Sequence, residues 1–432
     1  MSRRGGPETE SRVRRQGTGA RAPQPGIAVD PDAARAAMVA RLEEEGALGP
    51  GLVRDALLSL PREVLMPQAY VRRSAPEEPT SRWDLLDWAV PGDREELLGV
   101  LYGGESVLIQ HDGEPLLGRV PGSRSGGMIT SMSSTVGMTA GLLRELDLRP
   151  GHRVLDVGTG AGVTAAVACW VCGDRGVVTV DRDPHVTEAA RTRLAELGYR
   201  PAVVTGDGEA GWEEWAPYDR VFVSYAVPWV PWAWVQQLAP GGRLLATVTG
   251  TSPSWPGLAV ITRTAHGRMK GELRAVELGH RPGHGFQRIF LSRAFVDRIS
   301  AGDGGHNHHS RTAPPPDESR GLWLAIAALR PGLVRNWGAD HLMIGAPACG
   351  SWLTARPDTA GTWTMTACGP RDIWDEIQTV AARWRAAGSP TSYRLHLDAH
   401  GEQWVNAGSG EEELAWSLPR LSSPEPTEAR VA

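Results

Sequence analysis

The sequence predicts an α/β fold, in which a mostly parallel sheet with an antiparallel edge is joined to a smaller C-terminal α+β domain. Three observations predict it. From residue 154 onward, short β-branched runs alternate with helical segments, an order typical of a parallel sheet covered by helices. A glycine-rich turn at residues 158–162 follows the first run. Two short alternating runs, at residues 258–264 and 272–278, indicate the antiparallel edge.

The composition excludes several classes of protein. The chain has 432 residues, 41% of them hydrophobic, and a formal net charge of -5, which gives no general attraction to nucleic acid or to anionic membranes. No apolar run approaches the roughly 18 residues of a membrane span. Four unevenly spaced cysteines and the absence of an apolar N-terminal run indicate a reducing compartment. We therefore expect a cytoplasmic monomer that binds neither nucleic acid nor membrane.

Composition also suggests how the chain is divided. Residues 1–33 are rich in Arg, Gly, Pro and Glu, and we expect a disordered tail there, as we do for residues 419–432. Residues 34–300 would form the first domain. Residues 301–319, rich in Gly, His, Pro and Ser, are typical of a linker. Residues 320–418 would form a C-terminal accessory domain.

The N-terminal part of the first domain begins with two helices. One opens near Asp32 and ends at Gly46, and a second ends before Pro61. The runs 99–102 and 106–110, separated by a Gly-Gly pair, predict a hairpin. Residues 133–146 have helical spacing of apolar side chains.

The alternating series then supplies the sheet. Its clearest helix is expected at residues 185–197, and the C-terminal domain should contain an apolar run at 321–329 and a helix at 371–387. The predicted strands are 154–157, 177–180, 202–204, 220–223 and 243–248, with a C-terminal pair at 392–397 and 403–405.

The glycine turn indicates a nucleoside site. Its pattern is G-x-G-x-G and lacks the spacing typical of dinucleotide binding, which disfavours an NAD-linked oxidoreductase. Asp181 ends the second strand, where its carboxylate could accept hydrogen bonds from ribose hydroxyls, and Asp207 follows the third strand, within reach of an adenine amine. Each Asp taken alone could equally be a solvated strand end.

The order of these features resembles the class I S-adenosylmethionine-dependent methyltransferases, whose sheet is Rossmann-like. The segments 60–67, 223–231 and 236–243 narrow the resemblance to the protein-L-isoaspartate O-methyltransferase family, over about residues 34–290. The resemblance implies S-adenosyl-L-methionine as cofactor and no metal. It implies cofactor contacts at Asp156, Gly158, Thr159, Gly160, Gly162, Asp181, Asp207, Gly208 and Ser224.

The substrate segment departs from that family's pattern. The usual Thr-Ile-Ser-Gln-Pro falls by spacing on Met-Ser-Ser-Thr-Val at residues 132–136. Ser134 then takes the position of the family's serine, whose hydroxyl can hold the carboxylate being methylated, and Ser133 is its neighbour. We interpret both as candidate catalytic residues. The alternative is that the two serines only cap the following helix, since Ser is a preferred N-cap.

Three other signals favour structural roles. The C-x-x-C pair Cys169 and Cys172 lies in an apolar helix, which favours packing over redox or zinc chemistry. The histidine-rich residues 306–309 fall in the expected linker, which favours a polar connector over a metal site. Three tryptophans follow the fourth strand of the series and could line a peptide groove or cover the core. They are Trp229, Trp232 and Trp234.

The C-terminal part resembles an extension found in a subgroup of these methyltransferases. That subgroup is associated with ribosomally synthesised modified peptides such as lanthipeptides and ATP-grasp-ligated peptides. The resemblance implies methylation of an Asp side chain in a modified precursor peptide, leading to an aspartimide that can hydrolyse to isoaspartate. The alternatives are a general repair enzyme for isoaspartate in damaged proteins, and a non-catalytic cofactor-binding module. The expected partner is accordingly a peptide or protein bearing Asp or isoaspartate.

Overall fold

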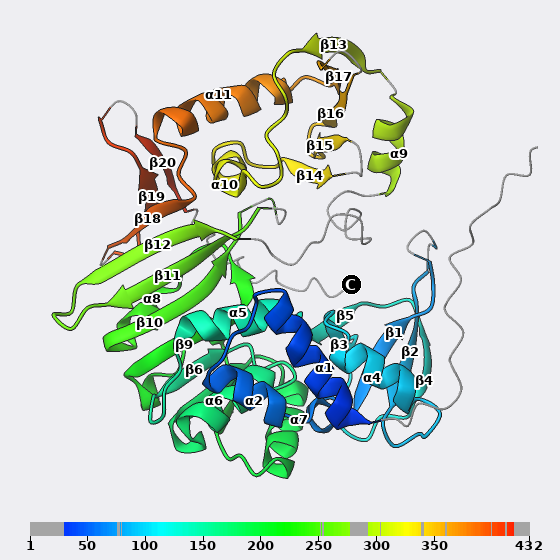
Figure 1. Ribbon diagram of the computed structural model, residues 1–432, viewed down its shortest axis with the longest axis vertical. Coiled ribbons are helices and arrows are strands. Elements are labelled where there is room, and N and C mark those ends of the chain that lie inside the picture. Colours follow the sequence, from blue (N-terminus) through cyan, green and yellow to red (C-terminus); the bar gives the residue numbers. More distant parts are fainter. Residues whose placement is uncertain are drawn as a thin grey trace, which may run out of the picture.

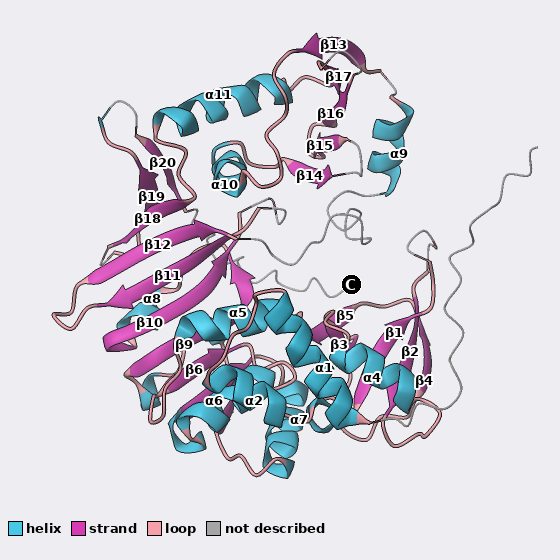
Figure 2. Cartoon of the chain, in the orientation of Figure 1, coloured by secondary structure: helices cyan, strands magenta, loops and turns pink. Residues whose placement is uncertain are grey.

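Three sheets make up the part of the chain that the computed structural model describes (Figures 1 and 2). That part comprises residues 30–75, 78, 80–250, 252, 255–276, 293–302, 304–337, 341–358, 361–398, 400–410 and 413–418. The expected tail at residues 419–432 lies outside it, as does the other expected tail up to residue 29.

Three helices open the described chain: α1 (Pro31–Glu44), α2 (Leu52–Ser59) and the short α3 (Arg62–Leu65). The side chain of Asp30 accepts hydrogen bonds from the first backbone N–H groups of α1, which is why the helix begins inside the expected tail. Met38, Val39 and Leu42 are buried on one face of α1. The two predicted helices are therefore confirmed.

The first sheet is antiparallel and was not expected from the sequence. Its strands lie in the order β4-β2-β1-β3-β5. They are β1 (Gln68–Arg72), β2 (Arg82–Asp87), β3 (Val107–His111), β4 (Gly122–Ser125) and β5 (Ile129–Ser133). The second strand of the predicted hairpin is present as β3, but the first is wrong. Residues 99–102 form the end of helix α4 (Arg94–Tyr102). Leu97, Leu98 and Leu101 are buried at helical spacing there, and this amphipathic pattern outweighs the short alternation.

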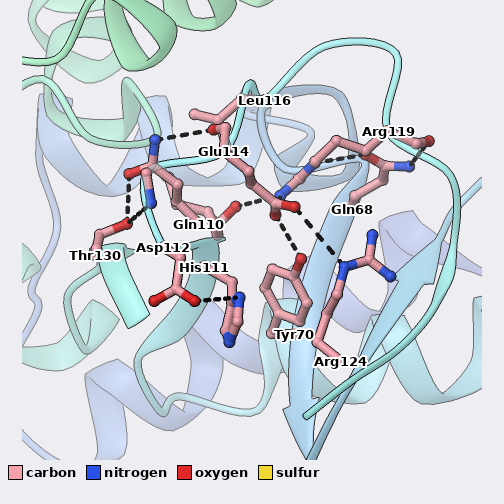
Figure 3. Close-up of polar contacts among 12 residues, drawn as sticks. Gln68, Tyr70, Gln110, His111, Asp112, Glu114, Leu116, Arg119, Arg124 and Thr130 are labelled. Carbon is pink, nitrogen blue, oxygen red and sulfur yellow. Dashed lines mark hydrogen bonds and ion pairs between the residues drawn. The ribbon is translucent and has the colours of Figure 1, made fainter. Parts of the chain in front are cut away.

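A partly buried polar cluster braces this sheet (Figure 3). Glu114 accepts hydrogen bonds from Tyr70 Oη at 2.5 Å and from Arg119 Nη1 at 2.8 Å. Burial, with the hydrogen bond to Glu114, raises the pKa of Tyr70 to about 12. Gln110 on β3 donates to Asp183 Oδ2 at 2.7 Å and accepts from Thr130 on β5 at 2.8 Å. The cluster thus ties β5 to the loop that follows Asp181.

The central sheet begins with the predicted alternating series. Its parallel strands lie in the order β10-β9-β6-β7-β8, and each contains its predicted strand. They are β6 (Val154–Val157), β7 (Val177–Asp181), β8 (Ala202–Thr205), β9 (Tyr218–Val227) and β10 (Leu238–Val248). The helices of this part are α5 (Val136–Leu146), α6 (Val163–Cys172), α7 (Pro184–Glu196) and α8 (Trp232–Gln236), with 3-10 turns Asp174–Gly176, Gly208–Ala210 and Glu213–Trp215. In Figure 1, α1, α2 and α5 lie over the same part of this sheet, and α2 packs against both α5 and α6.

The antiparallel edge is wider than the sequence indicated. The predicted pair is present as β11 (Gly257–Arg263) and β12 (Met269–Ala275), although residues 277–278 lie outside the described residues. Three strands from the end of the chain continue the sheet beyond β12: β18 (Ser392–Leu397), β19 (Gln403–Ala407) and β20 (Leu414–Ser417). The first two are the predicted C-terminal pair. Their pairing with β12 could not be predicted, because it joins segments far apart in the sequence.

The third sheet has the order β13-β17-β16-β15-β14 and packs with three helices. The strands are β13 (His306–Ser310), β14 (Val334–Trp337), β15 (Leu342–Ala346), β16 (Ser351–Pro357) and β17 (Trp363–Cys368). The helices are α9 (Arg293–Ala301), α10 (Arg320–Leu329) and α11 (Ile373–Ala386). The helix predicted at 371–387 is confirmed as α11, and the apolar run at 321–329 proves to be helix α10. The expected linker is wrong at residues 306–310, because β13 pairs with β17 over five residues.

One apolar core joins this sheet to the central one. Leu322 and Ile326 of α10 and Ile344 of β15 belong to the same buried cluster as Leu155 of β6 and Val221 of β9. No helix of the described chain is both long and apolar enough to cross a membrane.

Candidate active site

The glycine turn closes the carboxyl end of β6 in backbone conformations that require glycine. Gly158, Gly160 and Gly162 have φ of 94°, 49° and 79°, and Gly162 is the N-cap of α6. The N–H of Gly158 donates to the carbonyl of Val180 on β7 at 2.8 Å. A Cβ on Gly160 would lie 3.3 Å from the carbonyl oxygen of Met132. The turn therefore presents bare backbone to the space in front of β5.

Asp156 supports this turn from beneath. Thr179 Oγ1 donates to Asp156 Oδ2 at 2.8 Å and lies 2.7 Å from Thr159 Oγ1. Asp156 is 0% exposed, and its burial raises the pKa of its carboxyl to about 7, although the hydrogen bond from Thr179 acts in the opposite direction. We predicted a direct cofactor contact for Asp156. The structure instead gives its side chain no exposed surface and connects it to the turn through threonines.

Asp181 and Asp207 lie at the carboxyl ends of adjacent strands, as predicted. Asp181 Oδ2 accepts from the N–H of Gly160 at 3.1 Å, and its Oδ1 accepts from the N–H of Asp183 at 3.1 Å. Asp207 is exposed, and its Oδ1 accepts from the N–H of Glu209 at 3.0 Å. Asp181 is therefore fixed against the glycine turn.

The predicted substrate serines and the glycine turn meet in one cavity of about 60 Å³. Among the side chains and backbone that line it are those of Ser133, Ser134, Met138, Gly158, Gly160 and Ser224. The structure thus brings together residues from β5, α5, the turn after β6 and the end of β9. Asp181 and Asp207 are not among the lining residues of this cavity.

The helix-capping alternative for the two serines is wrong. The N-cap of α5 is Thr135, and no side chain caps this helix by a hydrogen bond. Ser133 is the last residue of β5, where it pairs with Val107. Ser134 is half-buried and lines the cavity without a capping role.

Tyr225 is a residue of this region that sequence reasoning missed. If Gly158 carried a Cβ atom, that atom would lie 3.0 Å from the ring of Tyr225. A Cβ atom on Gly208 would lie 2.7 Å from the Tyr225 hydroxyl. Burial, followed by the charges of Glu209, Asp207 and Asp181, raises the pKa of Tyr225 to about 12. Its phenol therefore reaches from the glycine turn to the end of β8, among the predicted cofactor carboxylates. An aromatic residue after a strand carries no local signal of such a position.

The tryptophans after β9 prove to have different roles. Trp234 is 0% exposed, and its indole N–H donates to the carbonyl of Gly208 at 2.7 Å. It is therefore a core residue that holds the predicted cofactor loop. Trp229 and Trp232 are half-buried.

The other sequence signals have structural surroundings. Cys169 and Cys172 are buried free thiols of α6, and burial raises the pKa of both, to about 11 for Cys172. His306, His308 and His309 lie on β13 at the edge of the third sheet. Within the described residues, no group of three or more His, Cys, Asp or Glu side chains is arranged to hold a metal ion.

Known proteins share the segment of the chain that contains the cavity and the glycine turn. A family model described as protein-L-isoaspartate (D-aspartate) O-methyltransferase matches residues 125–273, which contain the cavity and the glycine turn. The protein-L-isoaspartate O-methyltransferase 2 of Archaeoglobus fulgidus is 38% identical over 158 residues, which are 35% of this chain and 70% of the relative. The chain belongs to the protein-L-isoaspartate O-methyltransferase family.

Two further similar proteins carry the same family description. Protein-L-isoaspartate O-methyltransferase 1 of the same organism is 43% identical over 117 residues, which are 27% of this chain and only 54% of that relative. A solved family structure from Plasmodium falciparum, in complex with S-adenosyl-L-homocysteine, covers 56% of this chain and 96% of its own, with 16% identity and a TM-score of 0.40. The strand order of the central sheet and the family membership confirm the predicted fold class, an α/β Rossmann-like methyltransferase sheet with an antiparallel edge and a smaller C-terminal α+β part.

The residues present fit the cofactor of this family, S-adenosyl-L-methionine. Gly158 and Gly160 leave a cradle that a side chain at either position would enter, and Asp181 lies directly beside it. Backbone N–H groups at the start of α6 and the carboxylates of Asp181 and Asp207 supply donors and acceptors suited to a nucleoside with a cationic sulfonium.

Proposed function

We propose that this protein is an S-adenosylmethionine-dependent carboxyl O-methyltransferase that acts on an Asp or isoaspartate carboxylate of a peptide. One observation carries the proposal: the hydroxyl-bearing segment at Ser134 and the glycine turn line the same cavity. A group held at Ser134 would therefore lie close to a cofactor held by the turn. S-adenosylmethionine, when bound, supplies a methyl group on a positively charged sulfur.

The protein's task in such a reaction is positioning. A carboxylate is ionised at pH 7, so no base is needed to activate it. Ser134 would donate a hydrogen bond that orients the carboxylate in line with the methyl group. Met138 and Leu142 add apolar surface to the cavity, which excludes water while opposite charges neutralise each other.

Cofactor binding would fall to the carboxyl ends of β6, β7 and β8. Asp181 is positioned to accept from the ribose hydroxyls, and Asp207 to accept from the adenine amine. Thr159, Gly162, Gly208 and Ser224 shape the surrounding backbone and the cavity wall. Asp156 would act indirectly, by holding Thr179 and through it the turn.

Within this activity, we propose that the substrate is an Asp side chain of a modified, ribosomally made precursor peptide. Methylation converts the carboxylate, which has no good leaving group, into a methyl ester. A backbone amide nitrogen can then attack the ester carbonyl. The nitrogen loses its proton, methanol is expelled, and an aspartimide ring closes. Two features support this substrate. The segment at residues 132–136 departs from the usual family pattern, and C-terminal strands extend the central sheet.

General repair of isoaspartate is the second candidate, and the family relationship favours it. The relatives are named as protein-L-isoaspartate methyltransferases, and one of them matches over 70% of its length. A repair enzyme must accept unrelated sequences, whereas a peptide-tailoring enzyme acts on one precursor.

The two candidates are separated by a mass-spectrometric assay with two substrates. Unrelated linear isoaspartyl peptides and an Asp-containing modified precursor encoded beside the gene are incubated with the protein and S-adenosylmethionine. A methyl ester or dehydrated aspartimide on the precursor alone supports peptide tailoring, and turnover of all isoaspartyl peptides supports repair. Either product should be absent with Asp181→Asn. If no peptide of either kind gains a methyl group, the protein is a cofactor-binding module and the proposed activity is wrong.

A further inference from the structure

A second hollow opens beside the candidate active site. It has a volume of about 300 Å³ and lies between α5 and the ends of β10, β11 and β12. Met138, Leu142 and Thr247 line both this hollow and the cavity that contains Ser134. The two spaces therefore adjoin at a shared wall. We call the second one the α5 groove.

The α5 groove is uncharged over most of its length. One wall of the groove is formed by α5. Gly137 and Gly141 contribute only backbone to this wall, and Met138 and Leu142 contribute apolar side chains. The side chains of Leu258 and Val276 form the opposite wall, while the side chain of Ala275 packs with the core on the other face of the sheet. Such a surface accommodates a peptide backbone with an uncharged side chain and disfavours a charged one, because a charge would lose its water there.

The far end of the α5 groove is polar. There Arg274 Nη2 donates to Glu145 Oε1, so the two charges neutralise each other. The Nε–H of the same guanidinium is buried, yet it has no hydrogen-bond partner among the described residues. A buried donor without an acceptor is unfavourable. Because Glu145 would repel a second carboxylate, the acceptor that fits this position is a neutral carbonyl oxygen.

The spacing matches a short extended peptide. Met138, at the shared wall, and Glu145, at the polar end, are seven residues apart on α5, which is about 10 Å along a helix. An extended chain advances about 3.3 Å per residue, so about three residues span this distance.

From these observations we propose that the α5 groove binds the substrate segment next to the methylated carboxylate. The segment lies extended, with an uncharged apolar side chain against Met138 and Leu258 and, about three residues from the carboxylate, a backbone carbonyl on the Nε–H of Arg274. The assignment rests on the proposed carboxyl methyltransferase function and adds to it a preference for apolar residues beside the modified one.

Two substitutions test the groove. Arg274→Lys keeps a positive charge opposite Glu145 but removes the Nε–H, and Val276→Trp fills the groove with a large side chain, because Val276 lines the groove and is half-buried. Arg268→Lys is the matched control, because Arg268 is an exposed residue near the opposite end of the same β11–β12 hairpin. Six-residue peptides containing Asp or isoaspartate, flanked by leucine or by lysine, are titrated calorimetrically into protein saturated with S-adenosylhomocysteine. The methylation KM is measured on the same peptides.

The wild type should bind leucine-flanked peptides at least fivefold more tightly than lysine-flanked ones. Arg274→Lys should weaken peptide binding and raise KM about tenfold, as expected for one lost hydrogen bond to a charged donor. Val276→Trp should abolish the preference for leucine. Arg268→Lys should match the wild type, and the affinity for S-adenosylhomocysteine should be the same in all four proteins.

The binding and kinetic measurements can contradict the proposed peptide groove and the proposed methyltransferase activity independently of each other. Peptide affinities within twofold of wild type in both groove variants, or no saturable peptide binding by the wild type, would overturn the groove. The same follows if the affinity for S-adenosylhomocysteine falls in parallel with that for peptide. Peptide binding as expected without any methyl transfer would keep the groove and reject the proposed function.

Discussion

Ser134 and Ser131 have different surroundings although they are only three residues apart in sequence. Ser134 lines the cavity, while Ser131 is half-buried on β5 and is not among the lining residues. Only a hydroxyl at the cavity can hold a carboxylate there. This difference offers a direct test of the proposed clamp.

Replacing Ser134 by Ala should lower kcat/KM about tenfold to a hundredfold. The reason is the loss of one hydrogen bond to a charged group, worth roughly 1.5–3 kcal/mol. Steady-state methylation kinetics measure the effect, and Ser131→Ala serves as the control expected to keep wild-type activity. An unchanged kcat/KM in Ser134→Ala would remove Ser134 from the reaction.

Tyr225 should slow cofactor entry. Its ring and hydroxyl occupy the span between Gly158 and Gly208, so a nucleoside bound by Asp181 and Asp207 requires the side chain to move. Tyr225→Ala should raise the association rate of S-adenosylhomocysteine up to about tenfold, since more of the protein would be competent to bind. Stopped-flow tryptophan fluorescence measures this rate. Tyr225→Phe keeps the ring and should behave as the wild type, and equal rates in all three proteins would contradict a gating role.

Asp156 should make stability depend on pH. Its folded-state pKa is about 7, against roughly 3.9 in an unfolded chain. Between these values the folded state holds a proton that the unfolded chain has lost, so the free energy of unfolding falls as the pH rises from 4 to 7 and changes no further above that. Three pKa units correspond to at most about 4 kcal/mol.

Urea denaturation of wild type and Asp156→Asn across this pH range isolates the effect. The variant cannot titrate at this position, so the stability of the wild type relative to the variant should decrease as the pH rises towards 7. A difference that stays constant from pH 4 to pH 8 would show that Asp156 is ionised throughout.

At the scale of single elements, the turn after β6 depends on its glycines. Gly158 has φ of 94° and faces Tyr225, so a side chain there is strained and crowded. Gly158→Ala should lower the free energy of unfolding by about 1–3 kcal/mol, measured by urea denaturation. Gly99→Ala is the contrasting control. It lies inside α4 with open space around it, and should raise stability by about 0.5–1 kcal/mol. Equal effects of the two substitutions would refute a specific requirement at the turn.

The sequence predicted some elements far better than others. The strands of the alternating series were found because each is a short apolar run, mostly buried and often β-branched, between helical or glycine-containing segments. In the first sheet, β4 reads Gly-Ser-Arg-Ser and its four residues are exposed or half-buried, so it carries no hydrophobic pattern. The glycine turn, Asp181 and Asp207 could be proposed as site residues because they follow these strands, whereas Ser134 could be proposed only from the family resemblance. Tyr225 and the α5 groove were missed because they depend on contacts between β9, β8, α5 and β12 that no local pattern encodes.

At the scale of the whole molecule, the C-terminal strands belong to the central sheet. β18 pairs with β12, and the side-chain amide of Gln403 on β19 donates to the carbonyl of Val230 at 2.6 Å and accepts from its N–H at 3.0 Å. These contacts hold the segment that follows β9 and Tyr225. The apolar core also continues from the central sheet through α10 into the third sheet.

A chain shortened to residues 30–302 should therefore not behave as an independent domain. It would leave the edge of β12 unpaired and expose the apolar surface that α10 covers, which favours aggregation. Size-exclusion chromatography and thermal unfolding test this, with the full-length chain as reference. A monomeric fragment that unfolds at the temperature of the intact protein would show that residues 34–300 are self-sufficient.

The pairing of β12 with β18 also fixes the order of events during synthesis. A ribosome completes β12, then makes α9, the third sheet and its helices, before β18 exists to pair with it. During that interval the nascent chain carries an open strand edge, and the loop beyond Tyr225 lacks the amide of Gln403. The antiparallel edge of the central sheet and the loop after β9 can therefore reach their final form only after β18 and β19 have been made.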